Sequence, residues 1–231
     1  MKIIDSSQKD IVAELKRIIN RGETATEEAA QTVKEIVERV RKEGDPAVLA
    51  YTEKFDRVSL TLKDLRVTPG EIKDAYTRVE PKKVDALKLA AANIKSFHEK
   101  QKLSSWVSQE AHGVILGQLA RPLRSVGVYV PGGKAVYPSS VLMNVIPARG
   151  AGVEQIVMCS PVPGGVLNPY ILVAADIAGV SEIYKIGGAQ AIAAMAYGTA
   201  TIPKVDKIVG PGNIYVATAK RYVFGQVDID M

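Results

Sequence analysis

The sequence predicts an α/β fold in which a helical N-terminal region is followed by a parallel sheet of about five strands with flanking helices. Two observations lead to this expectation. In roughly the first hundred residues, apolar side chains recur at helical spacing. Beyond residue 125, short apolar runs alternate with helical patterns. Such consecutive β–α units form parallel sheets, because right-handed crossovers are the common way to join their strands.

Helices are expected to fill the N-terminal region. One helix stops near Gly22, and Thr24 or Thr26 can cap a second one. The chain then restarts at Asp45-Pro46, because aspartate caps exposed backbone amides and proline suits the first helical turn. The expected helices span residues 8–20, 24–44, a segment from 45 onward, 70–79 and 81–101.

The pattern changes after Trp106. Residues 113–120 are short, apolar and flanked by turn formers, which predicts a strand or hairpin leading into the next domain. The expected strands are 126–130, 155–159, 182–186, 204–209 and 227–231, and the expected helices between them are 140–146, 168–179, 189–197 and 214–224. We therefore divide the chain into an N-terminal helical segment (1–22), a helix-rich first domain (23–124) and a sheet domain (125–231).

Composition narrows the class of protein. The 47% apolar residues are typical of a core-forming chain, and the formal charge of +5 comes from basic residues interleaved with acidic ones. This interleaving indicates a solvated surface rather than a nucleic-acid patch. No apolar run approaches the roughly 18 residues of a membrane span, and the N-terminus lacks a signal-peptide core, so we expect a cytoplasmic protein. Cys159 is the single cysteine and is expected to be a buried thiol.

Three of the four expected β–α turns carry glycines together with a polar side chain that can face a shared crevice. These side chains are Tyr129, Gln190 and Asn213. In open α/β sheets, ligands bind at the carboxyl ends of the strands, where helix N-termini offer free amides to a phosphate. Ser139 or Ser140 can cap the first of those helices. The alternative is that glycines simply end strands and that Asn213 only caps its helix.

No standard nucleotide fingerprint is present. The chain has no G-x-G-x-x-G, and Cys159-Ser160-Pro161 stands where a dinucleotide site usually has an acidic residue. Lys134 lies in a glycine-rich loop without P-loop spacing, so it is either a phosphate contact or a solvated lysine. With only His98 and His112, no zinc-ligand set is evident. The residues alone predict an α/β domain that binds a phosphorylated or nucleotide ligand.

Three long segments resemble the signature of the histidinol dehydrogenase family: GVYVPGGKAVYPSSVLMNVIPA (127–148), KIGGAQAIAAMAYGT (185–199) and KVDKIVGPGNIYVATAKR (204–221). The resemblance covers the whole chain, including Phe97-His98-Glu99 and residues 44–47. The end of the chain, VDIDM (227–231), is similar to the point where that family runs on into a glycine-proline-serine-glutamate segment.

The resemblance implies an NAD-dependent enzyme of histidine biosynthesis that oxidises L-histidinol through L-histidinaldehyde to L-histidine. It implies that residues 125–231 form a Rossmann-like NAD-binding domain in which Tyr129, Gln190 and Asn213 contact the coenzyme. It also implies a homodimer when full length, and a zinc ion whose ligands lie beyond Met231. No catalytic or metal-binding residue is thus expected in this chain. We expect it to be inactive alone, with its first domain completed by downstream residues. The alternative is a non-catalytic nucleotide-binding module.

Overall fold

The structure is a computed structural model that describes residues 11–132 and 136–230, without the side chains of residues 13, 14 and 17–28. At its centre is a five-stranded parallel sheet in the order β5-β4-β3-β6-β7. The strands are β3 (Ser125–Tyr129), β4 (Gln155–Cys159), β5 (Glu182–Tyr184), β6 (Lys207–Val209) and β7 (Asp228–Ile229). Counted along the chain, this is the order third, second, first, fourth, fifth, which matches the first five strands of the doubly wound order 3-2-1-4-5-6. The predicted α/β fold class is confirmed.

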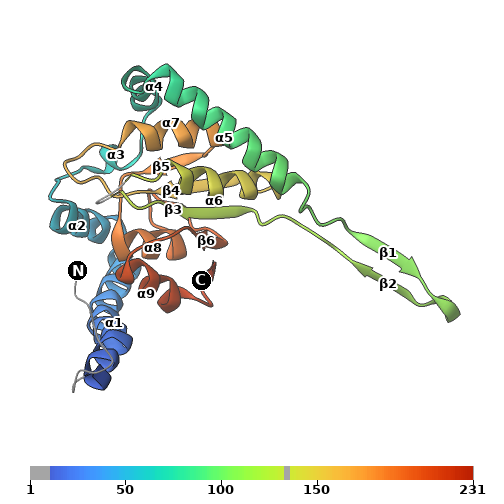
Figure 1. The fold of residues 1–231 in the computed structure, drawn as a ribbon, viewed down its shortest axis with the longest axis horizontal. Helices are drawn as coiled ribbons and strands as arrows, with labels where there is room; N and C mark the ends of the chain where they lie inside the picture. The colour runs from blue at the N-terminus through green and yellow to red at the C-terminus, as the bar shows by residue number, and fades with distance from the viewer. Residues whose placement is uncertain (1–10, 133–135, 231) are drawn as a thin grey trace.

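Helices cover both faces of the sheet (Figure 1). One face carries α6 (Pro138–Gly150) and α7 (Pro169–Ala178), and the other carries α8 (Gly188–Tyr197) and α9 (Ile214–Val223). Successive residues of β4 alternate between the two cores: Ile156 and Met158 belong to one, Val157 and Cys159 to the other. Because both faces are buried, the strands have the nearly continuous apolar sequences typical of parallel sheets.

The N-terminal helices form an outer layer on both sides (Figure 1). They are α1 (Ile11–Glu43), α2 (Asp45–Asp56), the short α3 (Leu62–Leu65), α4 (Pro69–Arg78) and α5 (Pro81–Glu99). α1 packs on α8 and α9, and α2 packs on α8. α4 packs on α7, whereas α5 packs on α6 and α7. The helices of the first hundred residues are thus in direct contact with the layers of the sheet. The division of the chain into domains stays a prediction.

Three local predictions were wrong. The N-cap of α2 is Gly44 rather than Asp45, whose side chain accepts a hydrogen bond from the Thr201 hydroxyl instead. α1 runs unbroken through Gly22, so Thr24 and Thr26 lie inside a helix and cap none. A glycine costs a helix interior only about 1 kcal/mol, and the following turns of α1 are anchored by burial of its apolar side chains on α8 and α9. The N-cap of α6 is Tyr137 rather than Ser139 or Ser140. Pro138 takes the first helical position and so starts the helix earlier than expected.

A β-hairpin extends away from the body of the molecule (Figure 1). β1 (Trp106–Gln109) pairs antiparallel with β2 (Ile115–Gln118), which confirms the expected hairpin before the sheet. Apolar side chains on it are exposed, among them Val107 at 77% and Ile115 at 68%. Within the described ranges, no helix is both long and apolar enough to cross a membrane.

Candidate functional site

Tyr129, Gln190 and Asn213 line one cavity of about 750 Å³. Tyr129 ends β3, Gln190 lies in the first turn of α8 after β5, and Asn213 caps α9 after β6. The cavity therefore opens at the carboxyl ends of the strands, where β3 leads to a helix on one face of the sheet and its neighbour β6 leads to a helix on the other. This is the topological switch point at which open α/β sheets bind ligands. The structure brings the three side chains together, while their role in coenzyme binding stays a prediction.

Tyr129 is buried, and its hydroxyl accepts a hydrogen bond from the Gly188 N–H at 3.1 Å. This bond ties the first turn of α8 to the central strand. Burial raises the pKa of Tyr129 to about 12; the Gly188 N–H opposes the shift, and the Asp56 carboxylate and Cys159 thiol add to it. The phenol is therefore neutral near physiological pH and keeps its O–H proton available to a ligand.

Gln190 is only 1% exposed, yet neither atom of its side-chain amide has a hydrogen-bond partner within the described part of the chain. A buried polar group without a partner costs about 1–3 kcal/mol, so most such groups in proteins are paired. An unpaired amide in the wall of a cavity is satisfied by a ligand only if the ligand reaches its buried atoms. It offers one acceptor and two donors.

Asn213 caps α9 through its Oδ1, which leaves its Nδ2 available for another contact. Its Oδ1 accepts a hydrogen bond from the Val216 N–H at 3.1 Å, which makes Asn213 the N-cap of α9. Among the described residues, its Nδ2 donates to no partner. The capping role and a role in the cavity are thus compatible, because they use different atoms of the same amide.

The turn that carries Asn213 is held by an ion pair between a buried lysine, Lys220, and Asp230. Lys220, only 3% exposed, donates from Nζ to the Gly210 carbonyl oxygen and to Asp230 Oδ1, both at 2.5 Å. The other carboxylate oxygen of Asp230 accepts from the Gly210 N–H at 2.8 Å. Both backbone groups of Gly210 are therefore paired, and the β6–α9 turn is held in one conformation.

Two glycines allow the strand-end turns to approach one another closely. Gly210 has a φ of +108°, and a Cβ at this position would collide with the carbonyl oxygen of Tyr129. A Cβ on Gly132 would lie 2.9 Å from the carbonyl oxygen of Pro161, closer than real Cβ contacts. These positions require glycine because backbone packs directly on backbone. The neighbouring Lys134, for which a phosphate contact and a solvated side chain were the two interpretations, lies outside the described residues.

The sequence did not reveal that α2 also reaches this cavity. Phe55 and Asp56 line it, together with Pro161 and Tyr215. Asp56 Oδ2 accepts a hydrogen bond from the Val162 N–H at 2.9 Å, across 106 positions of sequence. Burial raises the pKa of Asp56, and the Val162 N–H partly offsets this. No local motif marks Asp56, so only the three-dimensional packing identifies it.

The remaining candidate residues lie elsewhere. Cys159 is buried in β4, and burial raises the pKa of its thiol far above the ordinary value, which makes it a poor nucleophile. His98 lies on α5, where its Nδ1 is 2.7 Å from Gln101 Oε1, and His112 is in the turn of the hairpin. In the ranges that the structure describes, no group of three or more His, Cys, Asp or Glu side chains could hold a metal ion.

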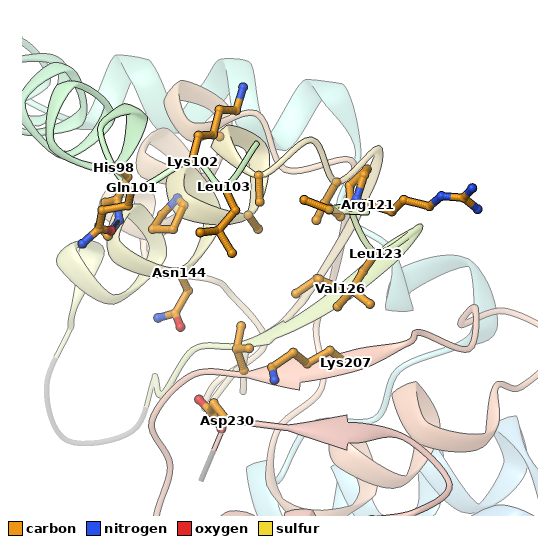
Figure 2. A pocket seen from close by; sticks show the side chains of 18 of the residues that line it. His98, Gln101, Lys102, Leu103, Arg121, Leu123, Val126, Asn144, Lys207 and Asp230 are labelled. Atoms are coloured by element: carbon orange, nitrogen blue, oxygen red, sulfur yellow. Dashed lines mark hydrogen bonds between the residues drawn. The ribbon is translucent and has the colours of Figure 1, made fainter. Parts of the chain in front are cut away.

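A second cavity, of about 790 Å³, lies between the end of α5, α6, the inner strand β6 and Asp230, which follows β7 (Figure 2). Two of its charged side chains are paired: Lys207 with Asp228 at 2.6 Å, and Asp230 with Lys220. His98 lies on the opposite side from Lys207 and Asp230 (Figure 2). Size does not separate the two cavities, but only the first contains the strand-end side chains and the unpaired amide. We therefore take the first as the candidate site.

Comparison with known proteins adds three similarities. The family model described as histidinol dehydrogenase matches residues 19–231. A histidinol dehydrogenase of Syntrophotalea carbinolica is 54% identical over 231 residues, which is 100% of this chain and 54% of the relative. One from Aquifex aeolicus is 55% identical over 233 residues, again 100% of this chain and 54% of the relative.

A solved structure is similar as well. The crystal structure of histidinol dehydrogenase from Elizabethkingia anophelis superposes with a TM-score of 0.83 at 43% identity, covering 87% of this chain and 46% of that one. The chain thus spans about half the length of the curated relatives it matches.

Proposed function

Because this chain belongs to the histidinol dehydrogenase family, we propose that it forms the coenzyme-binding part of an enzyme of histidine biosynthesis. The reaction we assign to the whole enzyme is the oxidation of L-histidinol through L-histidinaldehyde to L-histidine, with NAD as the coenzyme. In this proposal residues 125–231 are the NAD-binding domain. Residues 23–124 belong to a first domain that other residues complete.

One observation carries the proposal for the coenzyme: the buried, unpaired amide of Gln190 in the wall of the strand-end cavity. NAD presents a carboxamide, ribose hydroxyls and phosphate oxygens, so it can satisfy both the donors and the acceptor of this amide. The cavity volume of about 750 Å³ is within the range of small-molecule and cofactor sites, roughly 300–1,000 Å³. The residues present therefore fit the coenzyme.

Each of the three polar side chains makes a different contact with the coenzyme. Gln190 exchanges hydrogen bonds with a polar edge of the coenzyme through its free amide. Asn213 donates from Nδ2 while its Oδ1 keeps the cap of α9. Tyr129 supplies a neutral, buried phenol whose oxygen already holds the first turn of α8. These residues bind and orient the coenzyme and exclude water from it.

NAD, when bound, would supply the acceptor for the hydride that leaves the substrate carbon. Removal of the alcohol proton needs a base, and substrate orientation by zinc needs a set of metal ligands. The described residues offer no group of ligands for a metal. We therefore assign zinc binding and proton transfer to residues outside the described ranges, and we expect homodimerisation of the whole enzyme.

A non-catalytic nucleotide-binding module is the second candidate. It is favoured by the lining of the cavity, which contains no histidine or cysteine among the described residues. Such a module would bind NAD and leave L-histidinol unchanged even when the rest of the enzyme is supplied.

A fusion protein separates the two candidates. This chain is joined to the part of the Syntrophotalea carbinolica relative that follows the matched region. The fusion is incubated with L-histidinol and NAD, and reduced NAD is followed by its absorbance. We expect reduced NAD from the fusion and none from this chain alone. A folded fusion that binds NAD without reducing it would support the binding module instead, provided that the intact relative is active in the same assay.

A further inference from the structure

Asp56 brings a carboxylate to a corner of the cavity where the local sequence of the sheet supplies none. In dinucleotide-binding folds, an acidic residue at the end of the second strand accepts hydrogen bonds from the adenosine ribose. The second strand of this sheet is β4, which ends at Cys159 and is followed by Ser160-Pro161. These side chains carry no charge. The strand itself therefore lacks the group that usually contacts the ribose.

The structure places Asp56 at this corner from outside the sheet. Asp56 is the last residue of α2, and its Oδ2 accepts from the Val162 N–H at 2.9 Å, directly after Pro161. It lines the same cavity as Tyr129 and Gln190. The carboxylate thus lies at the carboxyl end of β4, although it comes from a helix more than a hundred residues earlier in the chain.

Hydrogen bonds at both ends of α2 help to position Asp56, in addition to the bond of its side chain. Arg57, in the left-handed conformation, ends α2 with a bond from its N–H to the Glu53 carbonyl oxygen at 3.1 Å. At the start of α2, Asp45 Oδ2 accepts from the Thr201 hydroxyl at 2.7 Å, which anchors the helix to the loop after α8. These bonds tie α2 and its carboxylate to their neighbours in the absence of a ligand, and a preorganised group discriminates better between ligands.

The carboxylate is only partly satisfied. The Val162 N–H uses Oδ2, and Oδ1 has no hydrogen-bond partner among the described residues. Within the same part of the chain, Asp56 forms no ion pair. A half-buried, uncompensated carboxylate favours ligands with hydroxyl donors and disfavours a second anion at the same place.

We propose that Asp56 accepts hydrogen bonds from the adenosine ribose hydroxyls of the coenzyme and so selects NAD over NADP. The inference rests on the proposed coenzyme function and names a specificity-determining residue for it. NADP differs from NAD by a 2′-phosphate on that ribose. Its negative charge would meet Asp56 Oδ1, where NAD presents a hydroxyl donor.

Calorimetric titration of this chain with NAD, NADP and 2′-deoxy-NAD tests the proposal. We expect the wild-type chain to bind NAD roughly tenfold or more tightly than NADP, since a misplaced charge costs more than the about 1.4 kcal/mol that equals a factor of ten. We expect 2′-deoxy-NAD to bind about three- to tenfold more weakly than NAD, since it lacks one donor to a charged acceptor. This second comparison needs no variant and so does not depend on the folding of one.

Asp56→Asn keeps an oxygen for the Val162 N–H and removes the charge. We expect it to bind NADP more tightly relative to NAD, so that the ratio of the two dissociation constants falls by roughly tenfold. Glu53→Gln is the matched control: it removes an exposed carboxylate one turn earlier on α2 that does not line the cavity. The control should keep the wild-type ratio.

The outcomes distinguish the inference from the function on which it rests. Equal wild-type affinity for NAD and NADP, or an unchanged ratio in Asp56→Asn with normal thermal unfolding, would overturn the role of Asp56 and leave the coenzyme site standing. An effect of Glu53→Gln equal to that of Asp56→Asn would also overturn it, because net charge alone would then explain the change. If none of the three nucleotides binds, the proposed coenzyme function fails and the inference fails with it.

Discussion

Replacing Gln190 by methionine should stabilise the ligand-free chain and weaken its binding of NAD. Gln190→Met keeps the length and approximate volume of the side chain while removing both polar atoms. In the structure, these two atoms are buried without a hydrogen-bond partner among the described residues. Folding therefore leaves an amide desolvated and unsatisfied, a cost that a thioether does not carry.

The expected changes in stability and in NAD affinity follow from the free-energy cost of an unpaired buried polar group. At about 1–3 kcal/mol for such a group, removing the amide should raise the free energy of unfolding by about 2 kcal/mol. For a chain of this size, 1 kcal/mol corresponds to about 2–4 °C, so the Tm should rise by about 4–8 °C. Loss of two hydrogen bonds to NAD, at about 0.5–1.5 kcal/mol each, should weaken binding roughly 5- to 150-fold.

Thermal unfolding and calorimetric titration with NAD measure the two effects on the same protein. Gln226→Met is a suitable control, because Gln226 is exposed and should change stability by less than about 0.5 kcal/mol. The reasoning would be refuted if Gln190→Met lowered the Tm, since the amide would then be satisfied in the free protein. It would also be refuted if the variant bound NAD as tightly as the wild-type chain does.

Three further predictions concern other residues of the site. Asn213→Asp keeps an acceptor for the Val216 N–H but loses the Nδ2 donor, so titration should show about three- to tenfold weaker NAD binding at unchanged Tm. Asn213→Ala removes the cap as well, so its free energy of unfolding should also fall by about 1 kcal/mol. Gly210→Ala forces a Cβ against the Tyr129 carbonyl oxygen at a φ of +108°, so urea unfolding should show a loss of at least about 1–3 kcal/mol, and a wild-type midpoint would argue against this geometry. Folding raises the pKa of Asp56, chiefly by burial, so its favourable contribution to stability is present below its unfolded pKa and is lost as the pH rises through the folded value. The stability of Asp56→Asn relative to wild type should therefore increase as the pH rises above the ordinary aspartate value of 3.8, and urea unfolding in a pH series that showed no such trend would contradict the burial of this carboxylate.

Much of the fold could be predicted because its signals are local. β4 and its neighbours are buried on both faces, so their sequences are short apolar runs between turn formers. One cap is equally local: Asn213 precedes α9 and bonds back to its first turn, as its residue type suggests. The convergence of Tyr129, Gln190 and Asn213 followed from topology, because the carboxyl ends of parallel strands meet at one edge.

The errors arose where a local preference was weaker than its surroundings. Gly22 predicts a helix end, yet the energetic cost of one glycine is small compared with the anchoring of α1 on two other helices. Asp56 could not be predicted at all, because its bond to the Val162 N–H depends on the packing of α2 near β4 rather than on any nearby motif. A partner 106 positions away leaves no spacing in the sequence to recognise.

The central claim is that the cavity at the strand ends is a coenzyme site completed by the Gln190 amide. Titration of this chain with NAD, side by side with Gln190→Met, tests it most directly. The account predicts saturable binding of one NAD per chain that weakens at least about fivefold in the variant. Failure of the folded wild-type chain to bind NAD, or equal binding by both proteins, would contradict it.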